Sequence, residues 1–117
     1  MIASLIGRVE KVGGNQVEIM VDGVGYLVSI GEKLIKKVDD GNEMKLFTYM
    51  AVSENDISLF GFESRDEVNL FKMLISVSGV GPKTGAQILG KTETEKIIKA
   101  IANADVNESL DELYKED

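Results

Sequence analysis

The first half of the chain alternates apolar and polar residues, a period of two that is typical of half-buried strands. In Gln16–Val21, for example, Val17 and Ile19 alternate with the polar Glu18. Such stretches, rich in β-branched and aromatic residues, predict strands at 2–12, 16–21, 26–30, 44–52 and 57–62. Turns are predicted at 13–15, 22–23 and 39–42, and a short helical connector at 32–38. Five strands in about 60 residues predict a small barrel such as an OB-fold, with an open antiparallel meander as the alternative.

The pattern changes at Glu63, after which apolar residues recur at helical spacing. Ser64 followed by Glu67 forms a capping box, which predicts the start of a helix that ends at Ser78-Gly79. The buried stripe of this helix is expected to contain Val68, Leu70, Phe71, Leu74 and Ile75. The predicted fold class is therefore α+β, a five-stranded OB-fold β-barrel followed by a small helix-hairpin-helix unit.

Two more helices are predicted after the first. Pro82 opens the second, because its missing N–H costs nothing in a first turn, and this helix ends near Gly90. Thr92 and Glu95 form a second capping box and open the third helix. The residues expected in the core are Met73, Ala86, Ile88, Leu89, Ile97, Ile98, Ile101 and Ala104. Apolar spacing in Leu110–Tyr114 predicts weak docking of the last residues.

Composition and charge exclude several classes of protein. The 117 residues include no Cys and no His, which removes disulfides, thiolate metal sites and the commonest general base. No apolar run approaches the roughly 20 residues of a membrane helix, and the first residues do not form a signal peptide, so a cytoplasmic protein is expected. The net charge of −7 argues against a general nucleic-acid coat. It divides into −3 over 1–62, +1 over 63–104 and −5 over 105–117, so the middle of the chain is compatible with phosphate.

The main chemical motif is Gly79-Val80-Gly81-Pro82-Lys83, which joins the first two predicted helices. Glycine can adopt positive φ, and the N–H groups that open the next helix face outward with the positive end of its dipole. A phosphate can bind there, with Lys83 as the neutralising charge and Val80 packed inward. Such a hairpin contacts the backbone of a nucleic acid rather than its bases. The candidate DNA-binding residues are Gly79, Val80, Gly81, Lys83 and Thr84. From spacing alone, a tight helix–helix turn without a ligand fits equally well.

A second candidate is the acidic stretch Ser53-Glu54-Asn55-Asp56 between the last two predicted strands. Acids at a hairpin tip are usually solvated turn residues. The functional alternative is an electrostatic wedge, in which fixed carboxylates repel phosphates and keep DNA strands apart. A metal or acid–base site is less well supported, because no third carboxylate lies nearby in the sequence. The aromatic residues include possible base-stacking positions, but core packing is expected for most of them.

These motifs, in this order, resemble the RuvA family, the Holliday-junction-binding subunits of the bacterial branch-migration complex. The resemblance rests on Ile6-Gly7-Arg8, Val21–Tyr26, Val52–Phe62 and Leu70–Lys83, and it covers residues 1–106. It implies a homotetramer that holds four-way junction DNA open and flat, and a partnership with RuvB, a ring ATPase. It also implies a role in recombination, repair and the SOS response to DNA damage. No catalysis, metal or cofactor is expected of this subunit itself.

The resemblance also assigns roles to residues. The residues that match the family's first DNA-gripping hairpin are Gly79, Val80, Gly81 and Lys83. Glu54 matches one acid of the family's central acidic pin. The second pin acid is usually an Asp beside it, where this chain has Asn55 followed by Asp56. The second negative charge is therefore either missing or supplied by Asp56.

The resemblance divides the chain into a barrel domain at 1–62, a helix-hairpin-helix domain at 63–106 and an acidic tail at 107–117. The family continues into a second Gly-x-Gly hairpin and a RuvB-binding domain, which the printed sequence lacks, so weaker DNA binding and no ATPase-binding domain are expected. The first hypothesis is a non-catalytic binder of four-way junctions. An assembly module with little DNA affinity is the alternative, and a metal-dependent nuclease that uses Glu54 and Asp56 is the third. No G-x-x-x-x-G-K-[ST] motif is present, so any motor activity must come from a partner.

Overall fold

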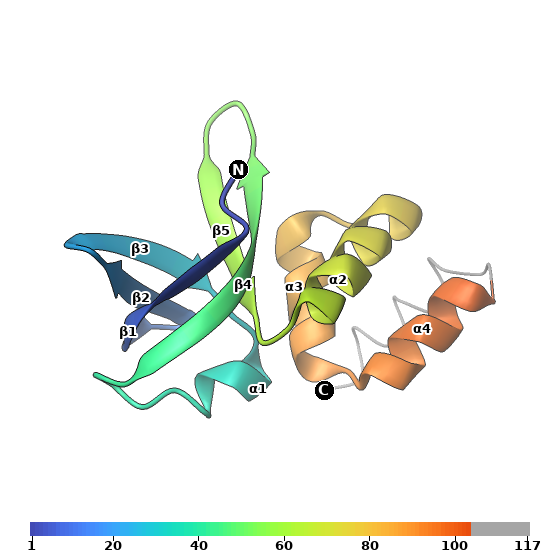
Figure 1. Ribbon diagram of the computed structural model, residues 1–117. Helices are drawn as coiled ribbons and strands as arrows, with labels where there is room; N and C mark the ends of the chain where they lie inside the picture. Colours follow the sequence, from blue (N-terminus) through green and yellow to red (C-terminus); the bar gives the residue numbers. More distant parts are fainter. Residues whose placement is uncertain (104–117) are drawn as a thin grey trace.

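The fold is a β-barrel followed by three helices (Figure 1). The computed structural model describes residues 1–103, without the side chains of Val77 and Ser78. The elements are β1 (Ser4–Gly13), β2 (Gln16–Val21), β3 (Val24–Ser29), α1 (Glu32–Ile35), β4 (Glu43–Val52), β5 (Ile57–Phe62), α2 (Arg65–Ser78), α3 (Pro82–Lys91) and α4 (Thr94–Ala102). Their order confirms the predicted α+β class. The predictions for Ala104, the docking of Leu110–Tyr114 and the tail at 107–117 lie outside the described residues.

The five strands close into a barrel in the order β1-β2-β3-β5-β4, with β4 pairing back to β1. All neighbouring strands are antiparallel except β3 and β5, which run parallel. This closure confirms the predicted OB-like barrel and shows that the open meander is wrong. The predicted alternation is also present, because Val17 and Ile19 are fully buried while Met20 faces solvent. At the β2–β3 turn, Asp22 (φ 49°) and Gly23 (φ 84°) both have positive φ, as two-residue hairpins often require.

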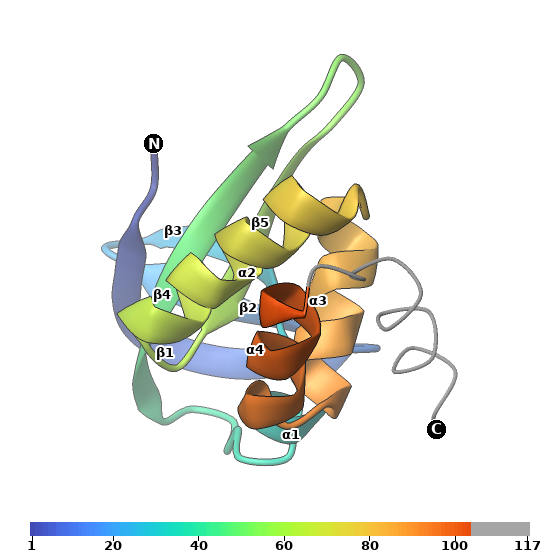
Figure 2. The same ribbon diagram turned by 90° about the vertical axis from the view of Figure 1, so that its right-hand side faces the viewer.

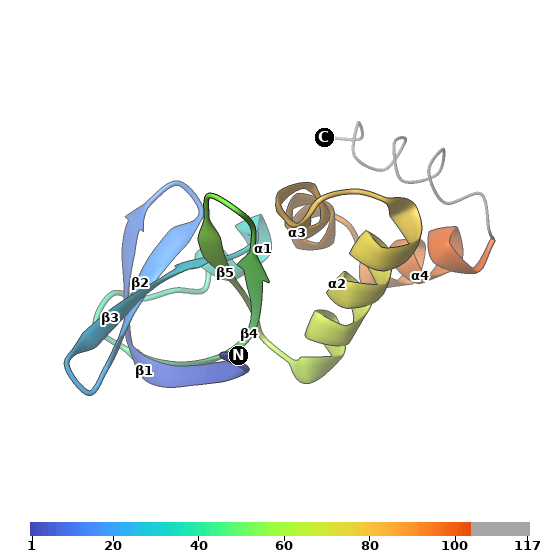
Figure 3. The same cartoon turned by 90° about the horizontal axis from the view of Figure 1, so that it is seen from above.

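A hydrophobic core joins the barrel to α2, α3 and α4. It contains Phe60 and Phe62 from β5 together with buried residues of α2, α3 and α4. Its centre is Phe71, which is completely buried and contacts the rings of Tyr49, Phe60 and Phe62 at centroid distances of 5.1, 5.8 and 5.1 Å. Figures 2 and 3 show the helices packed on the side of the barrel formed by β4 and β5. The apolar stripe predicted for the first helix is therefore the surface that attaches the helical unit.

The first predicted capping box is present at the start of α2. The Glu67 N–H donates to Ser64 Oγ at 3.2 Å, as a capping box requires. In return, the Glu67 carboxylate accepts from the N–H of Glu63 at 3.1 Å, one residue before the cap. The chain is thereby fixed where β5 passes into α2.

Three details of the later helices differ from the predictions. The capping box at Thr92 is wrong, because the Thr92 N–H donates to Ile88 O at 2.9 Å and Thr92 ends α3. Glu93 is the N-cap of α4 and has no side-chain cap. Met73 and Ile98 are 50% and 51% exposed, so both are surface residues, not core residues. Helical spacing predicted the apolar positions, but the packed faces of α2 and α4 are narrower than their apolar stripes.

A contact between two glycines sets how closely α1 and α3 approach. A Cβ added to Gly31 would lie 2.7 Å from the Cα of Gly90, and a Cβ added to Gly90 would lie 2.7 Å from the Cα of Gly31. Neither residue has positive φ, so the contact and not the backbone conformation requires glycine. Beside it, Lys33 Nζ donates to Thr92 O at 3.3 Å, and Lys37 pairs with Glu63 at 2.9 Å. The barrel and α3 therefore touch backbone to backbone.

Replacing Gly90 with alanine is expected to destabilise the protein by about 1–3 kcal/mol, because the added methyl group must push two backbones apart. In an exposed helix the same change stabilises by roughly 1 kcal/mol, so the expected sign is opposite to helix propensity. Gly25→Ala is the control, because the atoms nearest to a Cβ there belong to the flexible Glu18 side chain. Urea denaturation measures both. If Gly90→Ala is as stable as the native chain or more stable, the two backbones can move apart at little cost in free energy.

Candidate nucleic-acid interface

The turn between α2 and α3 has the backbone conformation that its glycines predict. Gly79 caps α2 in the left-handed conformation, with φ 75° and ψ 4°. A Cβ at this position would meet no atom within 4 Å, so the positive φ and not crowding favours glycine here. Val80 is half-buried. The chain thus reverses in a few residues, and α3 begins immediately afterwards at Pro82.

The first turn of α3 presents uncapped N–H groups. Gly81 is the N-cap, in an extended conformation, and it provides no side-chain cap. Pro82 has no N–H, and the Gly85 N–H donates to Gly81 O at 2.9 Å. The remaining donors of this turn are the N–H groups of Lys83 and Thr84, which lie at the positive end of the helix dipole. Lys83 has an exposed side chain next to them. Such an arrangement is suited to an anion.

The acidic loop projects at the end of the β4–β5 hairpin, beyond the body of the barrel (Figure 1). The Ser53 N–H donates to Asp56 O at 2.8 Å, and Ser53 Oγ donates to the same oxygen at 3.2 Å. Ser58 Oγ donates to Asp56 Oδ2 at 2.6 Å, which fixes the direction of that carboxylate. Glu54, Asn55 and Asp56 are all exposed. The loop is therefore a closed turn with two solvated carboxylates.

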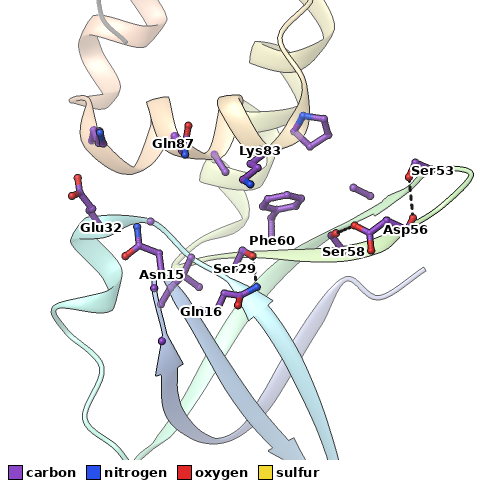
Figure 4. A pocket seen from close by; sticks show the side chains of 18 of the residues that line it. Asn15, Gln16, Ser29, Glu32, Ser53, Asp56, Ser58, Phe60, Lys83 and Gln87 are labelled. Carbon is purple, nitrogen blue, oxygen red and sulfur yellow. Dashed lines mark hydrogen bonds between the residues drawn. The ribbon is translucent and has the colours of Figure 1, made fainter. Parts of the chain in front are cut away.

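The acidic loop, residues 53–56, and the helical hairpin, the turn between α2 and α3, lie along the same groove between the barrel and α3 (Figure 4). Ser53, Asp56 and Ser58 line it on the barrel side, and Pro82 and Lys83 line it on the helix side. Residues 54, 55 and 79–81 are not part of the lining. Two motifs that are about 25 residues apart in the sequence are thus brought together by the Phe71 core.

The sequence does not predict the rest of this groove. Its other walls contain Asn15, Gln16, Ser29 and Gln87, of which the first lies in a stretch that predicted only a turn. No motif marks these residues, because their proximity results from the way β1, β2 and α3 pack. Residues 1–103 bring no three acidic side chains together in a way that would hold a metal ion. None of the helices in this part of the chain has the length and apolar character needed to span a bilayer.

Comparison with known proteins gives two family matches. Residues 1–61 match the RuvA N terminal domain, and residues 71–114 match the SAM-like helix-hairpin-helix tandem. Among the similar relatives are proteins named Holliday junction branch migration complex subunit RuvA. One from Limosilactobacillus fermentum is 38% identical over 105 residues, which are 90% of this chain and 52% of the relative. One from Caldanaerobacter subterraneus subsp. tengcongensis is 38% identical over 106 residues, which are 90% of this chain and 57% of the relative. The chain spans about half the length of the curated relatives it matches.

Proposed function

Because the chain belongs to the RuvA family, we propose that it is a non-catalytic subunit that binds four-way junction DNA through its phosphate backbone. In this proposal it supports branch migration by a partner ATPase during recombination and repair. The observation that carries the proposal is the turn from Gly79 to Lys83, whose left-handed glycine and uncapped first helical turn form an anion-binding backbone. The proposed domains are a barrel at 1–62 and a helix-hairpin-helix unit at 63–106.

The hairpin acts by holding one phosphate group. The N–H groups of Lys83 and Thr84 donate to phosphate oxygens, and the Lys83 ammonium neutralises the charge. Gly79 and Gly81 leave the backbone accessible to the sugar–phosphate chain, and Val80 anchors the turn. Because phosphates are the same at every base pair, these contacts fix the position of the DNA without reading its sequence.

The acidic loop acts by repulsion. Two carboxylates at 4 Å from a phosphate each raise the energy by about 1 kcal/mol in water, and by several times more near a protein surface. Glu54 supplies one charge, and we propose that Asp56 supplies the second, since Asn55 is neutral. The hydrogen bond from Ser58 Oγ to Asp56 Oδ2 supports this assignment, because it gives the carboxylate a fixed place in the turn. Repelled strands are then kept apart at the centre of the junction.

Neutralising the loop with Glu54→Gln and Asp56→Asn together is expected to raise affinity for a four-way junction by about tenfold, because two repulsions are removed. The junction should also lose part of its open, flat form. Fluorescence anisotropy measures the affinity, and energy transfer between labelled arms measures the form. Asp39→Asn with Glu43→Gln is the matched control, because it removes two exposed charges near the start of β4, the end of that strand away from the loop. An equal effect of both pairs would show that only net charge matters.

A gel-shift comparison of four-way, duplex and single-stranded DNA at low salt tests the proposed function. The expected order of affinity is four-way junction first and single-stranded DNA last. Absent binding, or equal binding to all three, would overturn the proposal.

We also propose that the binding species is a homotetramer, because a four-way junction presents four equivalent arms. Light scattering should give the mass of four chains without DNA, and that mass plus one junction when the junction is bound. A defined oligomer that does not bind the junction would favour the assembly module instead. A RuvB-type ATPase is the proposed motor. The test is to measure the ATPase activity of the purified motor on junction DNA with and without this chain.

A further inference from the structure

The groove between the barrel and α3 extends well beyond the two motifs at its mouth. It has a volume of about 890 Å³. Its barrel wall contains the β1–β2 turn, the ends of β3 and β4, part of β5 and the start of α1, and its other wall is α3 (Figure 4). The volume is at the upper end of the range for small-molecule sites. It suits a few nucleotides and is too small for a duplex.

The groove has polar side chains on both walls. Asn15 and Gln16 extend from the barrel, and Gln87 extends from α3 on the opposite side (Figure 4). Gln16 Nε2 donates to Ser29 Oγ at 3.4 Å, and both residues are half-buried. An amide side chain offers donors and an acceptor in one plane, so it can pair with the edge of any base. Such an amide can hydrogen-bond to the exposed edge of an unpaired base.

Charge in the groove is arranged for a single phosphate. The lining includes two cations, Lys83 and Lys91, and two acids, Glu32 and Asp56, so its net charge is zero. The acids are at opposite ends, and the Lys83 side chain points into the groove between them (Figure 4). Within the described part of the chain, no carboxylate lies within ion-pair distance of Lys83. A backbone phosphate beside Lys83 would be attracted there and repelled at both ends.

We propose that this groove receives unpaired nucleotides of one DNA strand at the crossover of the junction. One phosphate lies beside Lys83, and the base edges lie against the amides of Asn15, Gln16 and Gln87. The inference rests on the proposed function, because strand separation at the acidic loop is what exposes base edges. The groove begins at Ser53 and Asp56 of that loop, so separated bases enter the nearest polar concavity. The loops between strands 1 and 2 and between strands 4 and 5, which line it, are also where five-stranded barrels of this type bind oligonucleotides.

The first test compares a fully paired four-way junction with one that has a short run of unpaired thymidines at the crossover. The native chain is expected to bind the second about tenfold more tightly. Gln16→Glu and Gln87→Glu each place a carboxylate in the groove at nearly constant shape, and each is expected to abolish this gain. Affinity for the paired junction should fall only by the general effect of one added negative charge, which Asn42→Asp measures. Asn42→Asp adds the same charge outside the groove and should keep the gain. No gain in the native chain, or a gain that survives both groove variants, would overturn the inference and leave the proposed function intact.

A second test needs no junction. Side-chain amide signals of Asn15, Gln16 and Gln87 are followed by NMR while a short oligothymidylate is added to the full chain. Shifts at these three amides would support the groove, provided that those of Asn15 and Gln87 are absent in Gln16→Glu. Shifts confined to the backbone of residues 79–84, with none at the three amides, would overturn it. Because this measurement reports on the groove alone, failure of junction binding and failure of the groove are distinguished.

Discussion

Replacing Phe71 with alanine is expected to lower the free energy of unfolding by about 3–5 kcal/mol, the usual loss for a buried aromatic ring. Phe71 is completely buried, and its ring contacts Tyr49 of β4 as well as Phe60 and Phe62 of β5. A cavity at this place would loosen the packing of α2 on the barrel, since the Phe71 ring joins α2 to both strands. Urea denaturation followed by circular dichroism measures the loss.

Met73→Ala is the control for this prediction. Met73 lies two residues away on the same helix and is 50% exposed, so its truncation should change stability by about 0.5 kcal/mol or less. A loss below about 1.5 kcal/mol for Phe71→Ala would mean that the helices attach mainly through another contact. The glycine contact between α1 and α3 is the other candidate, and Gly90→Ala tests it separately.

Stability and junction binding should be coupled through Phe71. Its core holds the hairpin turn and the acidic loop on one groove, so their separation is set by packing that neither motif contains. A chain that retains both motifs but packs them loosely would not hold the Lys83 charge and the acidic loop at a fixed separation. We therefore expect Phe71→Ala to reduce preference for four-way DNA over duplex more than it reduces binding to duplex.

The strands were predictable because each one has a buried and an exposed face, and side chains on a strand alternate between faces. Val17 and Ile19 follow this rule, and the Asp22-Gly23 turn has a backbone that few other pairs adopt. Helix faces were less predictable. Ile98 has the spacing of a core residue, yet nothing among residues 1–103 covers it fully, and it remains 51% exposed.

The candidate site was predictable only in parts. Gly79 and Pro82 mark a helix end and a helix start by their own backbone chemistry, so the hairpin could be located from sequence. The Thr92 capping box failed because a Thr that follows a helix can end that helix as readily as it can begin the next one. The groove could not be predicted, because Gln16 and Gln87 line the same space only once the barrel and α3 have packed together.

The charge at Lys83 is expected to control DNA affinity. Lys83→Glu should weaken binding to four-way and duplex DNA by roughly tenfold to a hundredfold, because a charged hydrogen bond contributes about 1.5–3 kcal/mol. Loss of one phosphate contact should also lower the salt slope of log affinity by about 0.9 for each bound subunit. Anisotropy titrations over a range of salt, on several sequences, measure both quantities. The loss should be the same for every sequence.

Lys36→Glu is the matched control, since it reverses an exposed charge at the end of α1, away from the hairpin and the groove. Both variants change the net charge by the same amount, so a general electrostatic effect would weaken both equally. Only a phosphate held at the first turn of α3 predicts a larger loss, and a change in salt slope, for Lys83→Glu. A change in sequence preference at constant salt slope would instead indicate base contacts, and the hairpin would then act by a different mechanism from the one proposed.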